Sequence, residues 1–458
     1  MSTTTAEASA ETRELKDVVT EAMDRLHVPG VAVGIINGDE EIMEGYGVTS
    51  VEYPLPVTAH TLFQVGSTTK TISGLIAMRL VEQGRLDLDE PIRTYLPDLR
   101  LSDAGATSRV TMRHLLTHTG GFEGDWFVDF GRGDDSLAKA VVGMADLAQI
   151  APLGEVWSYC NSGFYLAGRV IELITGKPYE TVAREMVLTP LGLTESYFFP
   201  EEAMTRSFAV GHSIQGNEVK VARPWPVPRV AHPAGGLASS VRDNLRYARF
   251  LMGDGRAEDG TRIVREETLR YMQSDLVPAG PDRWVGITWY SREVDGIRLI
   301  SHGGGTNGQV SAFVFAPERN FAIAVLTNAS KGQMLEVVTD WAYQRYLGIT
   351  LPMPAVIDAS EEELRSYVGH YEDIASTVDI ALEDGKLMLT VGTKPEAMAA
   401  FSDEPPTSEP PMQVAPCGLN LLIVLDGDYK DLQLEALRNP DGSIRWLRLG
   451  SRLRTRKD

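Results

Sequence analysis

The segment that begins with Ser67-Thr68-Thr69-Lys70 constrains this chain more than any other. Residues 72–81, which follow it, are apolar around most of a helical circumference, and this predicts a helix that is buried on all sides. Residues three apart on a helix share one face, so the side chains of Ser67 and Lys70 are expected to be neighbours. The pattern therefore predicts a central helix that begins with a hydroxyl beside an amine.

A serine beside a lysine is a candidate nucleophile with its base. A hydroxyl attacks well only when a neighbouring base takes its proton. A lysine can be that base only when it is neutral, and burial favours the neutral amine. The free N–H groups at a helix N-terminus also favour a developing negative charge. These properties make Ser67 a candidate nucleophile and Lys70 a candidate base.

The same spacing occurs a second time, at Ser136 and Lys139. Asp134 and Asp135 precede this second pair and are typical of the start of a helix. The apolar positions that follow form one face only, so we interpret Ser136 as the cap of a surface helix with a solvated lysine. The spacing alone leaves both serines open as nucleophiles.

Charge and cysteine content limit the classes of partner. The chain has 458 residues, which is enough for two or three domains, and a net charge of −20. Such a charge disfavours binding to nucleic acid or to an anionic membrane, so neither is expected as a partner. The basic residues near the C-terminus, from Arg445 to Lys457, have the spacing of a solvated strand face. The two cysteines, Cys160 and Cys417, support neither a disulfide framework nor a zinc cluster.

Targeting and metal signals are weak. The N-terminal residues 1–8 are polar and lack the apolar core of a signal peptide. No apolar run is long enough to span a bilayer, and we expect a cytoplasmic protein. His114 and His118 have the i, i+4 spacing of a metal site, but no glutamate lies between them in the manner of a metalloprotease. We therefore expect no metal and no cofactor.

The order of the elements predicts an α+β fold. Residues 1–14 are expected to form a flexible arm, followed by a helix from about residue 13 to 26. Strands are predicted at 31–36 and 41–47, a mostly helical middle runs to about residue 260, and strands return at 285–290, 297–302, 310–315 and 322–326. A helix over 334–346 follows. This order predicts one antiparallel sheet built from both ends, flanked by helices and interrupted by a helical insert.

The C-terminal part has a different pattern. Residues 351–354 are interpreted as a linker. Asp384-Gly385 between two alternating runs predicts a hairpin, and further strands are expected at 421–425, 432–437 and 443–449. The pattern predicts a small antiparallel β-barrel, with a long loop at 402–416. We thus expect an arm over 1–14, a catalytic domain over 15–350 and a barrel domain over 351–458.

Two later segments supply groups that a serine nucleophile needs. Tyr159 and Asn161 have one residue between them, so both side chains can point the same way from an extended loop. A tyrosine beside a lysine cation is expected to lose its proton more easily. The glycine-rich run that starts at His302 lies between two strands, and such glycines favour a close approach of a ligand or another backbone. Taken singly, Tyr159 and Asn161 are more typical of a packed tyrosine and a turn asparagine, and the glycine-rich run is also typical of a hairpin with a surface histidine.

Together the three segments resemble the serine β-lactamase and penicillin-binding-protein superfamily. The resemblance is to the branch that holds class C β-lactamases, D-aminopeptidases, family VIII esterases and peptidase family S12. Ser67-Thr68-Thr69-Lys70 matches the first motif, Tyr159-Cys160-Asn161 the second, and His302-Gly303-Gly304 takes the place of the frequent Lys-Thr-Gly. The match runs from about residue 17 to 347 and favours Ser67 over Ser136. The tail resembles the lipocalin-like domain attached to some D-aminopeptidases, S12 peptidases and penicillin-binding-protein-type thioesterases.

The resemblance implies a β-lactamase/transpeptidase-like fold and a role for each motif residue. Ser67 would carry the acyl group, Lys70 would be the base and Tyr159 would share the proton transfer. Asn161 would orient the substrate and the lysine, and His302, a weaker and pH-dependent cation than lysine, would assist Tyr159 and the leaving group. The candidate site residues are catalytic Ser67, Lys70, Tyr159 and His302, with substrate-binding or oxyanion residues Asn161, Gly304 and Gly305.

The resemblance also implies a reaction. A histidine in the third motif is common among esterases and aminopeptidases, so hydrolysis of an ester or amide, including a peptide that contains D-amino acids, is the expected function. Acyl transfer, as in thioesterases that cyclise peptides, and a non-catalytic binding protein of the same fold stay open as alternatives. The expected partners are a small-molecule or peptide substrate and further copies of the chain in a homo-oligomer.

Overall fold

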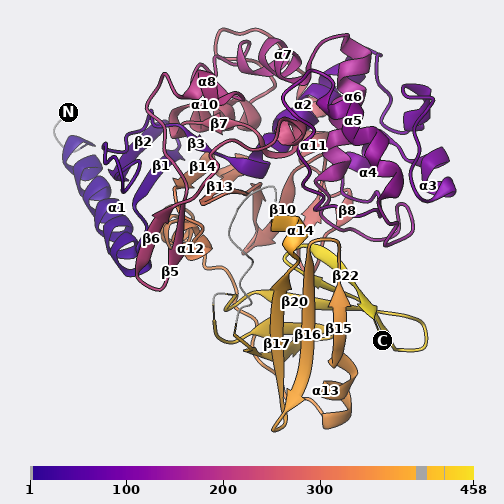
Figure 1. Ribbon diagram of the computed structural model, residues 1–458. Coiled ribbons are helices and arrows are strands. Elements are labelled where there is room, and N and C mark those ends of the chain that lie inside the picture. The colour runs from indigo at the N-terminus through magenta and orange to yellow at the C-terminus, as the bar shows by residue number, and fades with distance from the viewer. Residues whose placement is uncertain (1–3, 399–409, 428, 458) are drawn as a thin grey trace.

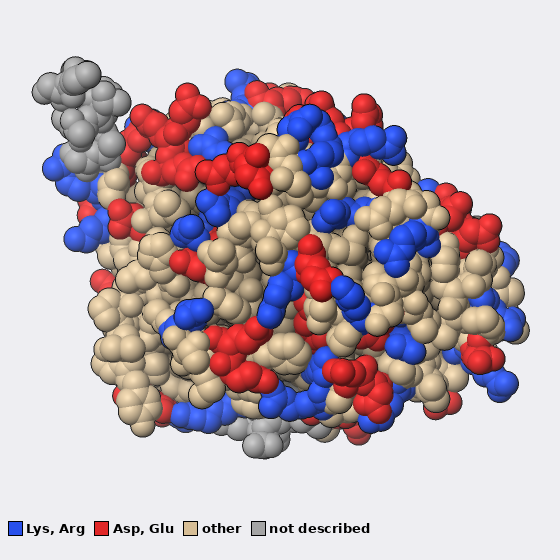
Figure 2. Space-filling view, turned by 90° about the horizontal axis from the view of Figure 1, so that it is seen from above, with Lys and Arg blue, Asp and Glu red and all other residues tan. Residues whose placement is uncertain are grey.

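The computed structural model describes residues 4–398, 410–427 and 429–457 and shows a large α+β part with a β-barrel beside it (Figure 1). The barrel, coloured orange to yellow, lies against the side of the large part where β10 (Tyr290–Val294) is labelled. Acidic and basic side chains are interspersed on the face shown in Figure 2. Among the described helices, none combines the length and the apolar character that crossing a membrane requires.

One antiparallel sheet organises the large part, as its strand pattern predicts. The two N-terminal strands pair with each other, and β1 also pairs with β14, which comes from near the end of this part. The strands of this sheet, in spatial order, are β2 (Glu40–Gly47), β1 (Gly30–Asn37), β14 (Phe321–Thr327), β13 (Gln309–Ala316), β11 (Ile297–Ser301), β10, β9 (Trp284–Val285) and β8 (Val277–Pro278), with β12 (Gly304–Thr306) paired to β13. The sheet is therefore built from both ends of the large part.

Alternating residues of β1 pack against helices on opposite faces of the sheet. Val31, Val33 and Ile35 pack with α1 (Thr4–Leu26) and α12 (Gly332–Ala342). On the other face lies α10 (Val241–Met252), where a Cβ on Gly34 would come within 2.9 Å of Leu245. This period of two is what a strand buried on both faces requires. The sheet is thereby fixed between helices and offers its end near β12 to the helical insert.

Short helices and strands make up the helical insert. Its helices are α2 (Thr69–Glu82), α3 (Ala104–Arg109), α4 (Met112–Leu116), α5 (Ser136–Gly143), α6 (Ser162–Thr175), α7 (Tyr179–Ala183), α8 (Pro200–Ala203), α9 (His232–Gly235), α10 and α11 (Glu266–Met272). Its strands are β3 (Phe63–Gln64), β7 (Ala238–Ser239) and β4 (Ser196–Tyr197), which form one small sheet, and the pair β5 (His212–Gln215) and β6 (Glu218–Val221).

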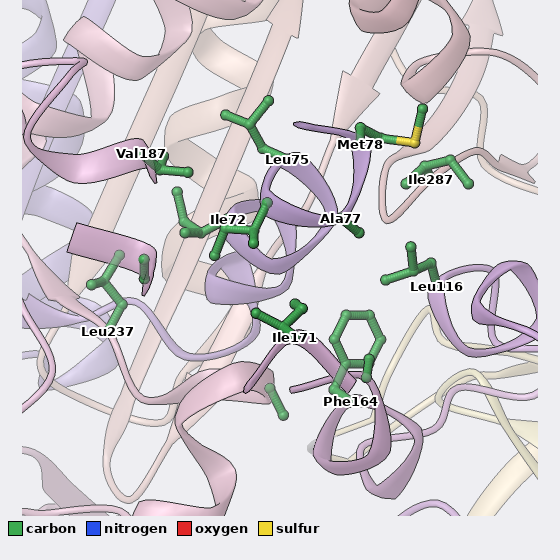
Figure 3. Packing of buried hydrophobic residues seen from close by; sticks show 14 of the residues in the cluster. Ile72, Leu75, Ala77, Met78, Leu116, Phe164, Ile171, Val187, Leu237 and Ile287 are labelled. Atoms are coloured by element: carbon green, nitrogen blue, oxygen red, sulfur yellow. The ribbon is translucent and has the colours of Figure 1, made fainter. Parts of the chain in front are cut away.

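Helix α2 lies at the centre of the insert, as its apolar sequence predicts. Figure 3 shows its side chains Ile72, Leu75 and Met78 surrounded by apolar residues of other segments, Phe164 of α6 and Ile287 among them. Leu75 is fully buried. A fully buried side chain of this size contributes about 1.5–3 kcal/mol. The packing holds the N-terminal end of α2, and thus Ser67 before it, in a fixed place.

The C-terminal part is a closed eight-stranded antiparallel barrel, as predicted. The positive φ values of Asp384 and Gly385, 48° and 77°, make the tight turn between β16 and β17. The strands in barrel order are β15 (Gly369–Glu372), β16 (Ser376–Glu383), β17 (Lys386–Thr393), β18 (Met412–Gly418), β19 (Leu421–Val424), β20 (Gln433–Arg438), β21 (Ile444–Leu449) and β22 (Arg452–Lys457). Two short helices, α13 (Glu361–Tyr367) and α14 (Pro395–Met398), accompany them.

Several local expectations differ from the structure. Residues 4–14, expected to be a flexible arm, belong to α1, whose residue Leu15 is fully buried. The strand expected at 285–290 is two short strands, β9 and the start of β10, because the chain bends at 286–289. In the loop expected at 402–416, residues 412–416 belong to β18, and residues 402–409 lie outside the described residues.

The arginines near the C-terminus are the largest difference. Arg448 and Arg454, expected on a solvated strand face, are buried with exposures of 9% and 8%. Arg448 donates to the backbone oxygen of Trp157 across the interface, and the Trp446 indole donates to that of Ile150. Buried charges need such partners. The face of the barrel that carries β21 and β22 is therefore an interface with the large part.

Candidate active site

Ser67 lies in a short turn, Gly66–Thr68, directly before α2. Gly66 has φ of +52°, and a Cβ there would lie 2.5 Å from the backbone nitrogen of Gly305. Only glycine combines this conformation with so close an approach of another chain segment. The turn leaves Ser67 partly exposed, and the residue lines a cavity of about 620 Å³.

Lys70, in the first turn of α2, is fully buried and within hydrogen-bond distance of Ser67. Its Nζ lies 3.1 Å from the Oγ of Ser67, 2.7 Å from the Oδ1 of Asn161 and 2.6 Å from the backbone oxygen of Ala234. Burial lowers the pKa of Lys70 far below its ordinary value, and the Arg452 cation lowers it further, while the Asp125 carboxylate opposes both. The neutral amine that the sequence suggested is thus favoured by its surroundings.

The three oxygens around the Nζ of Lys70 determine how a neutral amine is oriented. The oxygens of Ala234 and Asn161 can only accept hydrogen bonds, and they are the two closest. A neutral amine has two N–H donors and one lone pair. With both donors used in this way, the lone pair faces the hydroxyl of Ser67, which is the arrangement that removal of its proton requires.

Tyr159 and Asn161 come together beside Lys70, as their spacing predicts. They precede α6, and the ring of Tyr159 has its centroid 4.9 Å from the Nζ of Lys70. The expectation of an easily ionised phenol differs from the structure, because burial raises the pKa of Tyr159 well above its ordinary value. Nearby Tyr290 raises it further, and Arg452 and a hydrogen bond with Ser67 oppose this only in part. Tyr159 is therefore a proton donor in the resting site.

His302 lies between β11 and β12 and is 1% exposed. Its Nδ1 is 2.7 Å from the backbone oxygen of Gly303 and must carry the proton, since a carbonyl only accepts. Burial, and then the nearby Lys70, lower the pKa of His302 to about 3. The histidine is thus neutral at ordinary pH, and not the pH-dependent cation that the sequence suggested. Its Nε2 is left as an acceptor without a hydrogen-bond partner among the described residues.

Strand β12 places Gly304 and Gly305 against the turn that holds Ser67. A Cβ on Gly304 would lie 2.6 Å from the backbone nitrogen of Ser67 and 2.0 Å from the oxygen of Val65. Glycine is required at this position because any side chain would push the strand away from Ser67. The structure thus brings together all seven site residues that the sequence suggested.

The sequence missed the contribution of the barrel to this site. Ser451, in the β21–β22 turn, and Arg452, at the start of β22, line the same cavity as Ser67. The backbone oxygen of Ser451 accepts a hydrogen bond of 2.9 Å from the backbone of Tyr159. Arg452 pairs with Asp125 at 2.8 Å. Residues almost 400 positions from Ser67 give no local signal of this, and a run of arginines is more often a solvated face.

The alternative candidates in the sequence have other tasks in the structure. Asp135 is the N-cap of α5, so Ser136 is its first residue and is not the cap that we expected. Lys139 pairs with Asp135 at 2.9 Å and is about half exposed. His118 accepts a hydrogen bond from the backbone of Cys160 through Nδ1, and His114 uses its Nδ1 at the cap of α4. The described residues contain no group of three or more side chains that could hold a metal ion.

The β-lactamase family model matches residues 15–347. The chain belongs to the β-lactamase family. This family membership covers the sheet, the insert and all seven site residues, and the match ends before the barrel. Penicillin-binding protein 4 of Amycolatopsis lactamdurans is 35% identical to this member over 311 residues, which are 66% of this chain and 81% of that protein. Unguisins hydrolase ungD' of Aspergillus campestris is 26% identical over 69% of this chain and 62% of its own length.

Solved β-lactamase-like structures match the barrel as well. The crystal structure of SurE has a TM-score of 0.76 at 23% identity and covers 98% of this chain and all of SurE. The octameric penicillin-binding-protein homologue from Pyrococcus abyssi has a TM-score of 0.67 at 25% identity, covering 97% of this chain and all of that one. The combination of the β-lactamase-like fold with a barrel is therefore shared with these two proteins.

Proposed function

We propose that this protein is a serine hydrolase that cleaves an ester or amide bond through an acyl-enzyme on Ser67. The observation that carries the proposal is the geometry of Lys70, whose Nζ lies 3.1 Å from the nucleophile and donates to two neutral acceptors. Family membership supports hydrolase or acyl-transfer chemistry in general.

Acylation follows from these positions. The Oγ of Ser67 bonds to the substrate carbonyl carbon as its proton passes to the Nζ of Lys70. The charge that develops on the carbonyl oxygen is stabilised by the backbone N–H groups of Ser67 and Gly305. When the tetrahedral intermediate collapses, the bond to the leaving group breaks. Tyr159, a protonated phenol, donates the proton that the leaving group needs and regains one from Lys70.

Deacylation repeats these steps with water as the nucleophile. Lys70, neutral again, takes a proton from the water, whose oxygen bonds to the acyl carbon while the bond to Ser67 breaks. The proton returns to the Oγ of Ser67. Asn161 and Ala234 hold the amine throughout, so it needs no rearrangement between the two halves of the reaction.

The third motif and the cavity favour a substrate that carries a hydrogen-bond donor near the reacting bond. His302 lines the cavity in place of the lysine that would bind a carboxylate, and its buried Nε2 is an acceptor without a hydrogen-bond partner among the described residues. A peptide with a free amine, including one with D-amino acids, has such a donor. The substrate class is to be tested by comparing kcat/KM for D- and L-aminoacyl p-nitroanilides with kcat/KM for short-chain p-nitrophenyl esters. Turnover of none of these by folded protein would contradict the proposal.

Acyl transfer is the second candidate, because SurE, which matches almost the whole chain, has also been solved with D-Leu (TM-score 0.75, 22% identity). A transferase would pass the acyl group from Ser67 to an amine and not to water. Mass spectrometry of the products in the presence of D-Leu separates the two reactions. A dominant aminolysis product would assign transfer, and free acid alone would assign hydrolysis.

The partner is a small-molecule or peptide substrate in either reaction. Assembly into a homo-oligomer stays a prediction for this chain, and light scattering after gel filtration measures it. The comparison that motivates the measurement is the homologue from Pyrococcus abyssi, which is octameric.

The acid limb of the pH dependence should report Lys70 and not His302. The base is active only when deprotonated, and burial lowers its pKa, so kcat/KM should rise through a single acid limb and then level off. His302, with a pKa of about 3, is neutral throughout and should add no limb between pH 5 and 8, about the range in which an unperturbed histidine titrates. A pH profile with p-nitrophenyl acetate measures this. A limb that His302→Gln removes would contradict the assignment.

A further inference from the structure

Asp125 is a charged residue of the site that the reaction above does not use. It follows the end of α4 by several residues, its side chain is 15% exposed, and it lies between two functional elements. Its Oδ1 accepts a hydrogen bond of 2.6 Å from the Nδ2 of Asn161, and its Oδ2 one of 2.8 Å from the Nε of Arg452. Burial would raise the pKa of Asp125, but Arg452 and Asn161 more than offset this and lower it. The carboxylate is therefore ionised.

The Asp125 carboxylate decides which end of the Asn161 amide faces Lys70. A carboxylate only accepts hydrogen bonds, so it must face the NH2 end of the amide. The oxygen end is then directed to the amine, which it reaches at 2.7 Å. An amide without this partner can turn over and present its NH2 group to the amine, which would remove one of the two acceptors that orient the lone pair.

Arg452 connects the same carboxylate to the barrel. It starts β22, and its guanidinium lies over the ring of Tyr159 with 4.6 Å to the centroid. The two residues beside it in the chain are held by the large part: the backbone oxygen of Ser451 accepts from the backbone of Tyr159, and the backbone of Leu453 donates to the hydroxyl of Ser158 at 3.2 Å. A cation and an anion from different parts of the fold thus lie together beside the catalytic amine.

We propose that Asp125 is a positioning residue that joins Asn161 to Arg452, so that the seated β21–β22 turn of the barrel sets both the position and the charge environment of Lys70. This inference rests on the proposed function, because it concerns the base of that reaction. It makes the barrel part of the catalytic apparatus, although the barrel contributes none of the family's motifs.

The charged and titratable groups around Lys70 define the test. Arg452 disfavours the ammonium form of Lys70 and Asp125 favours it, with Cys160 a further small influence. The other groups at the amine are Tyr159, His118 and His302, of which the two histidines are neutral. Removing either charge of the ion pair should therefore move the acid limb of the pH profile, in opposite directions.

The experiment measures kcat/KM against pH for the full chain with p-nitrophenyl acetate, an uncharged ester that Arg452 cannot recognise by charge. Asp125→Asn should move the acid limb to lower pH and Arg452→Gln to higher pH, each by about 0.5–1 unit. The double variant should return to within about 0.3 unit of the wild type, since the opposing charges are then both absent. Arg452→Lys keeps the positive charge, so its acid limb should lie near that of the wild type.

Glu435→Gln is the matched control, because Glu435 pairs with Arg448 at the same interface but is not among the groups that act on Lys70. It should leave the limb unmoved. If Asp125→Asn does not fold, as judged by circular dichroism and Tm, Arg452→Gln against Arg452→Lys decides. The inference is overturned if the acid limbs of Asp125→Asn and Arg452→Gln stay in place or both move the same way. If a fluorophosphonate still labels Ser67 in that case, the proposed function is unaffected. A wild type that the probe does not label at Ser67 overturns the proposed function and this inference with it.

Discussion

Ser67→Ala should abolish the covalent adduct with a fluorophosphonate and lower kcat/KM by roughly 10⁴-fold or more. Among the described residues, Ser67 carries the hydroxyl that lies 3.1 Å from the Nζ of Lys70 and lines the cavity, and alanine leaves no group at this position that can carry the acyl chain. Intact-protein mass spectrometry before and after reaction detects the adduct. Because Ser67 is partly exposed in a turn, the fold should not change.

The matched control for this variant is Ser136→Ala. Ser136 belongs to the second Ser-x-x-Lys pattern but lies in α5, where its lysine partner pairs with Asp135. In the Ser136→Ala variant, the adduct on Ser67 should form as in the wild type. An adduct that survives Ser67→Ala, or that Ser136→Ala removes, would place the nucleophile elsewhere.

Lys70→Ala should lower kcat/KM by about 10²–10⁴-fold, the range for the loss of a general base. The loss should be largest at pH values above the acid limb, where the wild-type amine is deprotonated. The acid limb that belongs to this amine should disappear. The measurement is a pH profile with the same ester as above, together with the rate of labelling of Ser67.

Two variants control for packing and for charge in this experiment. Lys70→Met keeps most of the buried volume, so an equal loss of activity would assign the effect to the amine and not to a cavity. Lys139→Ala removes a half-exposed lysine of the other pattern, and such surface pairs contribute little, about 0.3–0.5 kcal/mol. Retention of most of the rate in Lys70→Ala would mean that another group is the base.

The sequence predicted most of the sheet because its strands are bounded by local patterns. Val31 to Ile36 and Ala322 to Leu326 are continuous apolar runs, and both became strands that lie side by side in the sheet. The Asp384-Gly385 turn was recognisable because its residues favour the positive φ values that it needs. The bend at 286–289 was not recognisable from the sequence, since its apolar residues are as typical of a strand as of a buried turn.

The ionisation states of the site were decided by the tertiary structure. A tyrosine near a lysine and a histidine in a glycine-rich loop suggest, by residue type, an easily ionised phenol and a titrating cation. Both side chains are in fact almost completely buried, at 6% and 1% exposure for Tyr159 and His302, and burial disfavours the charged form of each. Burial is a property of the whole fold and cannot be deduced from the residues beside them.

By itself, the sequence identified the candidate nucleophile, its candidate base and their partners in the second and third motifs: local spacing placed Ser67 beside Lys70 and Tyr159 beside Asn161, and the resemblance of the three motifs together favoured Ser67 over Ser136. Only the tertiary structure decided that Arg452, from the barrel, enters the site and pairs with Asp125. That contact joins residues more than 300 positions apart, and either one alone is typical of a solvated surface. The contact exists because the backbone of the β21–β22 turn is hydrogen-bonded to the segment that carries Tyr159, and this docking is a product of packing between two parts of the chain.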